Sequence, residues 1–562
     1  TDDSKAPQAW AFPAVSVPGG GFLVIFASGK DRTDPAGELH TDFQLNRAEG
    51  SYLALTRATL SGTAELVSVF DQYPQQQPNV SFGIASVQPL ESLAFFQTPT
   101  PGEANTGGDA IEGFVADTKF SVGRGLFTAV FEVEITSVTE GASIIYTVDG
   151  SFPTPDNGIV VPALNTTTAP IAKVSIATTT VLRAMAMKTG WAPTNVDTQS
   201  YIFPEKVLQQ DGSGLSGRRW GHAGVDWEMD PEIVNHEDPE SRVVVDDLLA
   251  LPTVSVSLPF DDVFGDNGIY PPGPEIAADG VERECAIEYL NSTANPAAPN
   301  EGDSLQSDGT IQIVGGSSTG RWKSDNLSMR LKFTSDLQYP MFGEEGASSF
   351  DTLVLDARLN HAWHYGGGSS PTEQRERALF VRDQLVADMQ RNLGGYSPRG
   401  HHVHFYINGI YWGIRMLHER PDDNFAASYL GGDNADYDVM KHNNSTVVAG
   451  TSANYRMLHS LAKKGLADPV NYQAVAAILD IDDFINYMLV NFYAGNSDWA
   501  HQNWYASFNR VDPNGKWRFH SWDAEHTFKV AGDNSTTKND AGGPTYLHQQ
   551  LVKNSEYLLR FA

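Results

Sequence analysis

Three side chains near the C-terminal end of the chain have the types and spacing needed to move a phosphoryl group. Asp498 is followed by Asn503 after four intervening residues, and Asp523 comes next along the chain. A carboxylate can accept the proton of an attacking hydroxyl, and an amide oxygen and a second carboxylate are ligands that Mg²⁺ prefers. The set indicates metal-assisted phosphoryl transfer, with a polar loop of no catalytic role as the alternative.

A predicted β-hairpin explains how the distant Asp523 could reach Asn503. Residues 504–508 and 516–522 are aromatic-rich, strand-like runs, and Asp512-Pro513-Asn514-Gly515 between them is typical of a turn. Pairing of the two runs would fold Asp523 back beside Asn503. The hairpin therefore predicts that both residues converge on one cleft.

Two helices are predicted around these residues. Apolar side chains recur at helical spacing over 480–494, with Asp480 as the N-cap, so Asp498 would follow a buried helix on its loop. Ser370-Pro371-Thr372-Glu373 is a capping box that predicts a second helix running to about Asn392.

Further upstream, the sequence predicts a second hairpin and a phosphate-binding loop. Residues 401–419 carry Asn408-Gly409 at the turn and end at Glu419. Residues 314–333 combine a Gly/Ser-rich turn with a basic strand, so backbone N–H groups could approach a phosphate and cations could supply charge. An ordinary turn is the alternative. The candidate cations are Arg321, Lys323 and Arg330.

Five segments together resemble the CotH family, atypical kinases named for a bacterial spore-coat protein. The resemblance extends from about 250 to 562 and implies a kinase-like α+β fold that transfers the ATP γ-phosphoryl group to Ser or Thr of a secreted protein. The segments are GGSSTGRWKSD…SMRLKF (315–333), RDQLVADMQ (382–390), YINGIYWGIRMLHERPD (406–422), NSDWAHQNW (496–504) and KWRFHSWDAEHTF (516–528).

The resemblance also implies a role for each candidate residue. Asp498 would be the catalytic aspartate, in a spacing that kinases share. Asn503, Asp523 and Glu525 would hold Mg²⁺, or else Mn²⁺ or Ca²⁺. Glu419 would pair with a lysine that touches the ATP phosphates, and Trp517 would flank the nucleotide base.

The chain departs from the family pattern at two positions. Asn326 stands where the pattern Lys-x-Ser-x-Arg has its lysine, and Asp523-Ala524-Glu525 replaces the usual Asp-x-Asp. Weaker ATP binding, or loss of activity with retention of the fold, would follow. In a regular strand Arg330 shares a face with position 326, so we expect Arg330, or Lys323 on the loop, to pair with Glu419.

The first half of the chain is predicted to be all-β. Residues 1–105 resemble a lamin-tail domain without its opening strand, and residues 116–203 resemble the β-sandwich at the C-terminus of chitobiases. Residues 204–249 are predicted to be a linker. The fold class is therefore two Ig-like sandwich modules followed by a kinase-like domain over 250–562, which ends in an apparently shortened helix.

Composition limits the partners. Across 562 residues, Lys and Arg total 38 against 69 Asp and Glu, a net charge of −31 that disfavours nucleic acid and anionic membranes. Cys285 is the single cysteine, which excludes a disulfide framework. We expect no membrane span, and no signal peptide is present, although the missing initiator Met predicts a processed chain or a fragment.

Two functions follow from the sequence. The first is a secreted or cell-surface bacterial protein kinase that uses ATP and acts on an unknown protein substrate. The second is a non-catalytic surface or matrix-binding protein that uses the same scaffold. In either case the β-modules could bind a surface polysaccharide or matrix.

Overall fold

The computed structural model describes most of the chain. It describes residues 1–45, 51–60, 62–77, 80–86, 92–105, 110–211, 228–270, 281–291, 304–315, 326–363, 365 and 371–562. Within these ranges, no helix is both long enough and apolar enough to cross a membrane.

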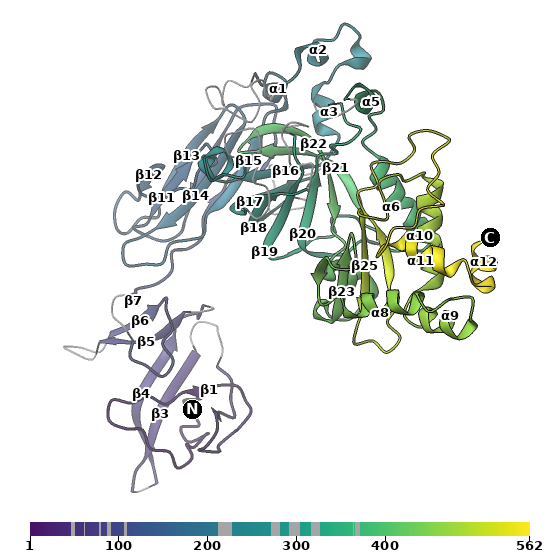
Figure 1. The fold of residues 1–562 in the computed structure, drawn as a ribbon. Helices are drawn as coiled ribbons and strands as arrows, with labels where there is room; N and C mark the ends of the chain where they lie inside the picture. The colour runs from purple at the N-terminus through teal and green to yellow at the C-terminus, as the bar shows by residue number, and fades with distance from the viewer. Residues whose placement is uncertain are drawn as a thin grey trace.

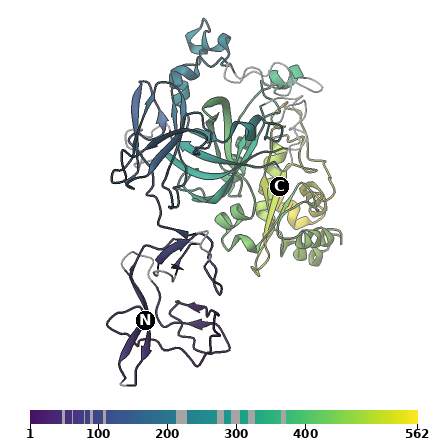
Figure 2. The ribbon, with the colours of Figure 1, turned by 90° about the vertical axis from the view of Figure 1, so that its left-hand side faces the viewer.

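The N-terminal unit consists of short sheets and lies apart from the rest of the chain in both views (Figures 1 and 2). Strands β1 and β2 pair in parallel, β3 pairs with β4, and β6 lies between β5 and β7. The strands are β1 (Ile25–Phe26), β2 (Leu39–His40), β3 (Ser51–Ala58), β4 (Ala64–Tyr73), β5 (Ser81–Ser86), β6 (Ser92–Phe96) and β7 (Ala110–Ile111).

The second unit is a sandwich of two sheets. One sheet has the order β13-β10-β8 and the other β12-β11-β14-β15-β9. Strand β13 alternates exposed and buried residues, as a strand with one face on a core must. The strands are β8 (Lys119–Phe120), β9 (Gly125–Leu126), β10 (Phe131–Thr136), β11 (Ser143–Thr147), β12 (Ile159–Pro162), β13 (Ile171–Ile176), β14 (Thr180–Met187) and β15 (Asp197–Ile202).

Short helices connect this sandwich to a closed seven-stranded barrel of order β16-β17-β18-β19-β20-β22-β21. The connecting elements are α1 (Pro204–Val207), α2 (Pro231–Val234), η3 (Pro239–Ser241) and α3 (Val245–Leu249). The barrel elements are β16 (Thr253–Ser257), α4 (Phe260–Phe264), β17 (Arg283–Leu290), β18 (Ser304–Ile313), β19 (Met329–Gln338), β20 (Ser349–Asp356), β21 (Gly400–Ile407) and β22 (Ile410–Glu419).

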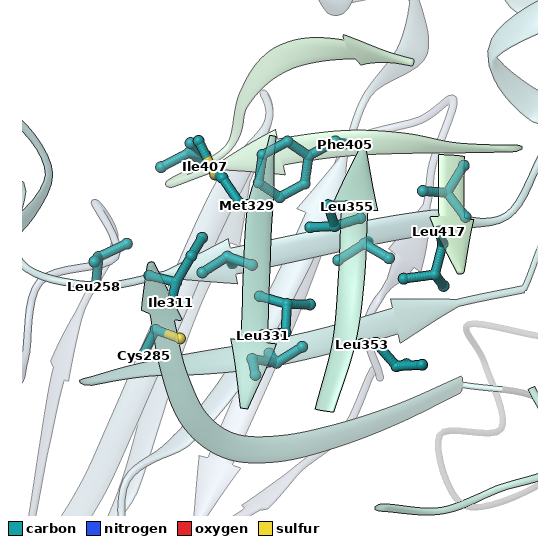
Figure 3. Close-up of a cluster of buried hydrophobic side chains, with 14 of the residues drawn as sticks. Leu258, Cys285, Ile311, Met329, Leu331, Leu353, Leu355, Phe405, Ile407 and Leu417 are labelled. Atoms are coloured by element: carbon teal, nitrogen blue, oxygen red, sulfur yellow. The ribbon is translucent and has the colours of Figure 1, made fainter. Parts of the chain in front are cut away.

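Apolar side chains fill the barrel (Figure 3). Ile311, Leu331, Leu355 and Phe405 come from four strands and are at most 1% exposed. The parallel pairing of β16 with β21 closes the barrel. The Asn408-Gly409 turn of the β21–β22 hairpin has positive φ at both residues, as a two-residue hairpin loop requires. The predicted hairpin is confirmed, while closure into a barrel was not predicted.

A helical lobe with its own sheet, β24-β23-β25-β26, completes the chain on the right of Figure 1. Its core contains Trp504, Trp517 and Phe519 among the helices. The elements are α7 (Asp423–Leu430), η5 (Asn434–Asp436), β23 (Tyr437–Lys441), β24 (Val447–Ala449), α8 (Ala453–Ala462), α9 (Pro469–Ala476), α10 (Ile481–Tyr493), β25 (Trp504–Asn509), β26 (Arg518–Ser521), α11 (Pro544–Leu551) and α12 (Ser555–Phe561). The fold class is thus as predicted: two β units followed by an α+β domain.

The predicted single helix from residue 370 to 392 is wrong, because two helices occupy this range: α5 (Pro371–Glu376) and α6 (Arg382–Asn392). Leu379 donates its backbone N–H to the His361 carbonyl, so the chain leaves the helical path between them. The break lets α6 dock on the C-terminal lobe, where Gln390 donates to the Phe519 carbonyl and accepts from the Ser521 N–H.

A buried polar joint connects the sandwich to the barrel. Glu288 of β17 has no exposed surface and accepts the Ser200 N–H of β15 at 3.0 Å, while the Arg124 Nε lies 3.1 Å from it. The Ser200 and Ser255 hydroxyls also meet at 2.8 Å. Glu288 depends on these partners because it has no water as a substitute, while the Arg124 side chain is 13% exposed.

We expect Glu288→Ala to destabilise the chain by about 3–5 kcal/mol, the usual cost of leaving one partner of a buried ion pair alone. Urea unfolding followed by tryptophan fluorescence measures the effect. Glu132→Ala is the matched control, since its partner Lys173 is exposed, and it should leave the urea midpoint nearly unchanged. Equal midpoints for both variants would contradict a stabilising role of the joint.

Candidate active site

Local structure around the predicted site forms as its sequence signals indicate. Helix α10 begins after Asp480, whose carboxylate accepts the Asp483 N–H. Strands β25 and β26 pair with Trp504 opposite Ser521, so Asn503 comes one residue before the pairing and Asp523 two residues after it. The Asn503 side-chain amide reaches the Asp523 carbonyl at 3.3 Å. The hairpin and the helix therefore deliver their polar residues to one place.

Asn503 links the two aspartates. Its amide nitrogen lies 3.1 Å from the Asp498 carbonyl, 3.4 Å from Asp498 Oδ2 and 3.3 Å from the Asp523 carbonyl. Asn503 and Asp523 both have positive φ, 57° and 53°, a conformation that Asn and Asp adopt more readily than other non-glycine residues and that is common at functional sites. The structure thus brings together the three residues that the hairpin argument predicts to converge.

The Asp498 side chain is 33% exposed, whereas Asn503 is buried. Gln502 donates to its Oδ1 at 2.8 Å, and the His501 ring lies 3.5 Å from the same oxygen. A carboxylate that is held at both oxygens yet open to solvent can receive an incoming hydroxyl group.

Carboxylates crowd around Asp523. Burial, and then Glu525, Asp383, Asp356 and Asp498, raise the pKa of Asp523 well above its ordinary value. Glu525 is 6% exposed and accepts both the N–H and the side-chain amide of Asn360. Burial together with Asp356 raises the pKa of Glu525 to about 8. The site therefore holds more carboxyl groups than its cations balance, and their mutual repulsion favours protonation or a bound cation.

Asp383 and Arg358 belong to this cluster and were missed in the sequence. Asp383 of α6 accepts the Ala524 N–H at 2.7 Å and Arg358 Nη1 at 2.8 Å. Arg358 also donates to Asp356 at 2.6 Å. The segment 350–358 ends in Asp-x-Arg, a signal that gains meaning only when the docking of α6 is known.

Arg330 does not lie in this cluster, and its predicted pairing with Glu419 is wrong. Its guanidinium donates to Glu282 at 2.9 Å and to Gln312. The strand register gives the reason. Leu331 lies opposite Leu353, and Leu353 lies opposite Glu419. Glu419 therefore lies on the same barrel face as Leu331, whereas Arg330 lies on the other face. The other candidate cations, Arg321 and Lys323, lie outside the described residues.

Glu419 is held by neutral groups. It is 2% exposed and accepts the Tyr429 hydroxyl at 2.7 Å and the Arg399 N–H at 2.8 Å. Burial raises the pKa of Glu419 to about 7. In the part of the chain that the structure describes, no Lys or Arg side chain forms an ion pair with it.

Trp517 is fully buried in the C-terminal lobe, where its ring stacks on Phe508 at 5.2 Å and meets the edge of Tyr455 at 5.0 Å. The structure does not bring it to the aspartates, and neither ring face is open to a base. Trp522, next to Asp523, is partly exposed and packs against Tyr505 and His418.

The residues present fit a hard divalent cation. Asp523, Glu525 and the Asn503 amide offer oxygen donors, and the surplus of carboxylates would be neutralised by such an ion. The Asn503 amide hydrogens point to Asp498 and Asp523, which leaves its oxygen available. Across the described ranges, no group of three or more His, Cys, Asp or Glu side chains is already arranged as a metal site.

We expect Glu419→Gln to change how stability depends on pH. The folded-state pKa of Glu419, about 7, lies above its ordinary 4.5, so its contribution is full below about pH 4.5 and is lost as pH rises to 7. Wild type should lose up to about 3 kcal/mol relative to Glu419→Gln between pH 4.5 and 8. Urea unfolding across pH measures this. Glu345→Gln, at an exposed carboxylate, is the control. A difference with the opposite slope would mean that a cation engages Glu419.

Comparison with known proteins agrees with this geometry. Residues 316–561 match the family model described as CotH kinase protein, and this range contains Asp498, Asn503 and Asp523. Residues 123–198 match the model described as Chitobiase/beta-hexosaminidase C-terminal domain. No curated protein matched the chain. The lamin-tail resemblance of residues 1–105 stays a prediction. Residues 316–561 are therefore similar to the CotH kinase family, and residues 123–198, which precede them, are similar to the chitobiase C-terminal domain.

Proposed function

We propose that the chain is an atypical protein kinase that transfers the γ-phosphoryl group of ATP to Ser or Thr of an extracellular or surface protein. The observation that carries the proposal is the Asn503 amide, which joins the accessible Asp498 to the carboxylate cluster of Asp523. The match to the CotH kinase family supports it.

In the proposed reaction the acceptor hydroxyl oxygen forms a bond to the γ-phosphorus while the bond from that phosphorus to the bridging oxygen breaks. ADP leaves, and the hydroxyl proton passes to Asp498. Gln502 and Asn503 orient the Asp498 carboxylate through both of its oxygens. Little else is asked of the protein, because positioning and charge stabilisation dominate this chemistry.

A divalent cation, Mg²⁺ in the first instance or else Mn²⁺ or Ca²⁺, would be held by Asp523, Asn503 and Glu525. When bound, it would neutralise charge on the phosphates. Asp383 keeps this loop in place through its hydrogen bond to the Ala524 N–H. Glu525 is held in turn by Asn360.

The remaining proposals concern the setting of the reaction. The chitobiase C-terminal-type module supports a secreted or cell-surface location and suggests a polysaccharide or matrix as its ligand. We also propose the division 1–105, 116–203, 204–249 and 250–562 for the domains, with the third range as the linker, although residues 212–227 of it lie outside the described residues.

A binding protein without turnover is the second candidate. The observation that favours it is Asn326 at the lysine position of the family pattern. Radiolabelled ATP with purified protein and Mg²⁺ or Mn²⁺ separates the two candidates: incorporated label supports the kinase, and absence of both label and ATP binding supports the scaffold.

Substitution of Asp523 should affect ATP binding, whereas substitution of Asp498 should affect phosphoryl transfer. Asp523→Asn should abolish metal-dependent ATP binding, because it removes a charged ligand from a hard cation. Asp498→Asn should keep ATP binding and lose phosphoryl transfer by about 100-fold or more, because general-base catalysis contributes about 10²–10⁴. Calorimetry and label transfer measure the two effects. Asp336→Asn, at an exposed carboxylate on β19, is the control. Equal loss of binding in both site variants would mean that the roles are misassigned.

A further inference from the structure

The chain carries an arginine, Arg358, just after the strand that pairs with the segment of the missing lysine. Met329 of β19 lies opposite Leu355 of β20, and the Ser328 hydroxyl donates to Asp356 at 2.9 Å. The Ala357 N–H donates in turn to Ser328 Oγ at 3.0 Å. Extended by three residues past Met329 and Leu355, beyond the ends of both strands, this register would put position 326 opposite position 358.

The contacts of Arg358 leave part of its guanidinium unused. The residue is 3% exposed, and its Nη1 donates to Asp356 at 2.6 Å and Asp383 at 2.8 Å. Its Nε and Nη2 atoms are buried and have no hydrogen-bond partner. Buried donors without an acceptor are costly, and an arginine fork matches the oxygens of a phosphate.

The surroundings tie Arg358 to the proposed metal ligands. Asp383, which holds its guanidinium, also accepts the N–H of Ala524 between Asp523 and Glu525. Glu525 lies close enough to act electrostatically on Arg358. Asn360, two residues after Arg358, donates to Glu525 at 2.8 Å. One hydrogen-bonded unit thus contains the arginine, a carboxylate of α6 and the Asp523–Glu525 loop.

Resting on the function proposed above, we propose that Arg358 is the phosphate-facing cation of the ATP site and takes the part of the lysine that position 326 lacks. Its ion pair with Asp383 of α6 corresponds to the Lys–Glu pair that protein kinases place between a strand and a helix. Because the Nε and Nη2 atoms of Arg358 are buried, this role requires the side chains around them to move when the phosphates enter.

The test compares ligands that differ only in their phosphates. We measure the affinities of Arg358→Gln and wild type for ATP, ADP and adenosine by calorimetry with Mg²⁺. ATP affinity should fall by about 10- to 100-fold, the loss expected for a charge-assisted hydrogen bond at a buried site. Adenosine affinity should not change. An equal loss for all three ligands would mean that Arg358 only supports the fold, and no loss for ATP would overturn the proposal.

A second variant guards against loss of the fold. Arg358→Gln leaves Asp356 and Asp383 without their cation, so the double variant Arg358→Gln, Asp383→Asn removes the pair together. Thermal unfolding shows which variant folds, and the ligand comparison is made on that one. Failure of wild type itself to bind ATP would refute the proposed kinase function, which is a different outcome from unchanged affinity in a variant.

Two further variants make the assignment specific. Arg382 is also buried with unpartnered Nε and Nη1 atoms, so loss of ATP affinity in Arg382→Gln but not in Arg358→Gln would transfer the role to Arg382. Arg330→Gln, at an arginine paired with Glu282, is the control that should bind ATP normally.

Asn326→Lys added to Arg358→Gln should recover ATP affinity. Failure to recover it would overturn the equivalence of the two positions.

Discussion

Surplus negative charge around Asp523 is the constraint on which the rest of the site depends. Five carboxylates influence one another there, and Arg358 is the cation bound directly to two of them. Like charges in a buried place repel unless each has donors to hold it. The donors come from separate places in the chain: Ser328 just before β19, Asn360 after β20, and the Ala524 N–H after β26. The fold brings together chain segments that alone would repel.

Helix α6 joins these segments. Near the start of α6, Asp383 accepts a hydrogen bond from the Ala524 N–H in the loop after β26. Further along the helix, Gln390 makes two hydrogen bonds to the β26 backbone. At the same end of α6, Asp383 accepts a hydrogen bond from the guanidinium of Arg358, which follows barrel strand β20. The barrel and the helical lobe are therefore aligned by hydrogen bonds from a single helix. A shift of α6 would move the arginine and the Asp523 loop together, because both are fixed to the same carboxylate.

The parts of the site that depend on neighbouring residues could be predicted from the sequence, and the parts that depend on distant pairing could not. The helix after Asp480, the turn at Asp512 to Gly515 and the Asn408-Gly409 turn are local signals, and all three form. Alternation along one strand predicts which side of the sheet Arg330 lies on. The side on which Glu419 lies depends on two strand pairings, and no local pattern reveals these pairings. Arg358 was missed for the same reason: its importance comes from α6.

The buried joint at Glu288 makes the sandwich and the barrel one mechanical piece. Beside it, Gln306 of β18 accepts from the Thr198 N–H and from Arg124, and Ile202, Leu290 and Tyr406 pack together. A module attached in this way is not a flexible tether. If it binds a ligand, as proposed above, the attachment would keep that ligand at a set distance and angle from Asp498. Only acceptor sites at that spacing along a matrix would then come within reach.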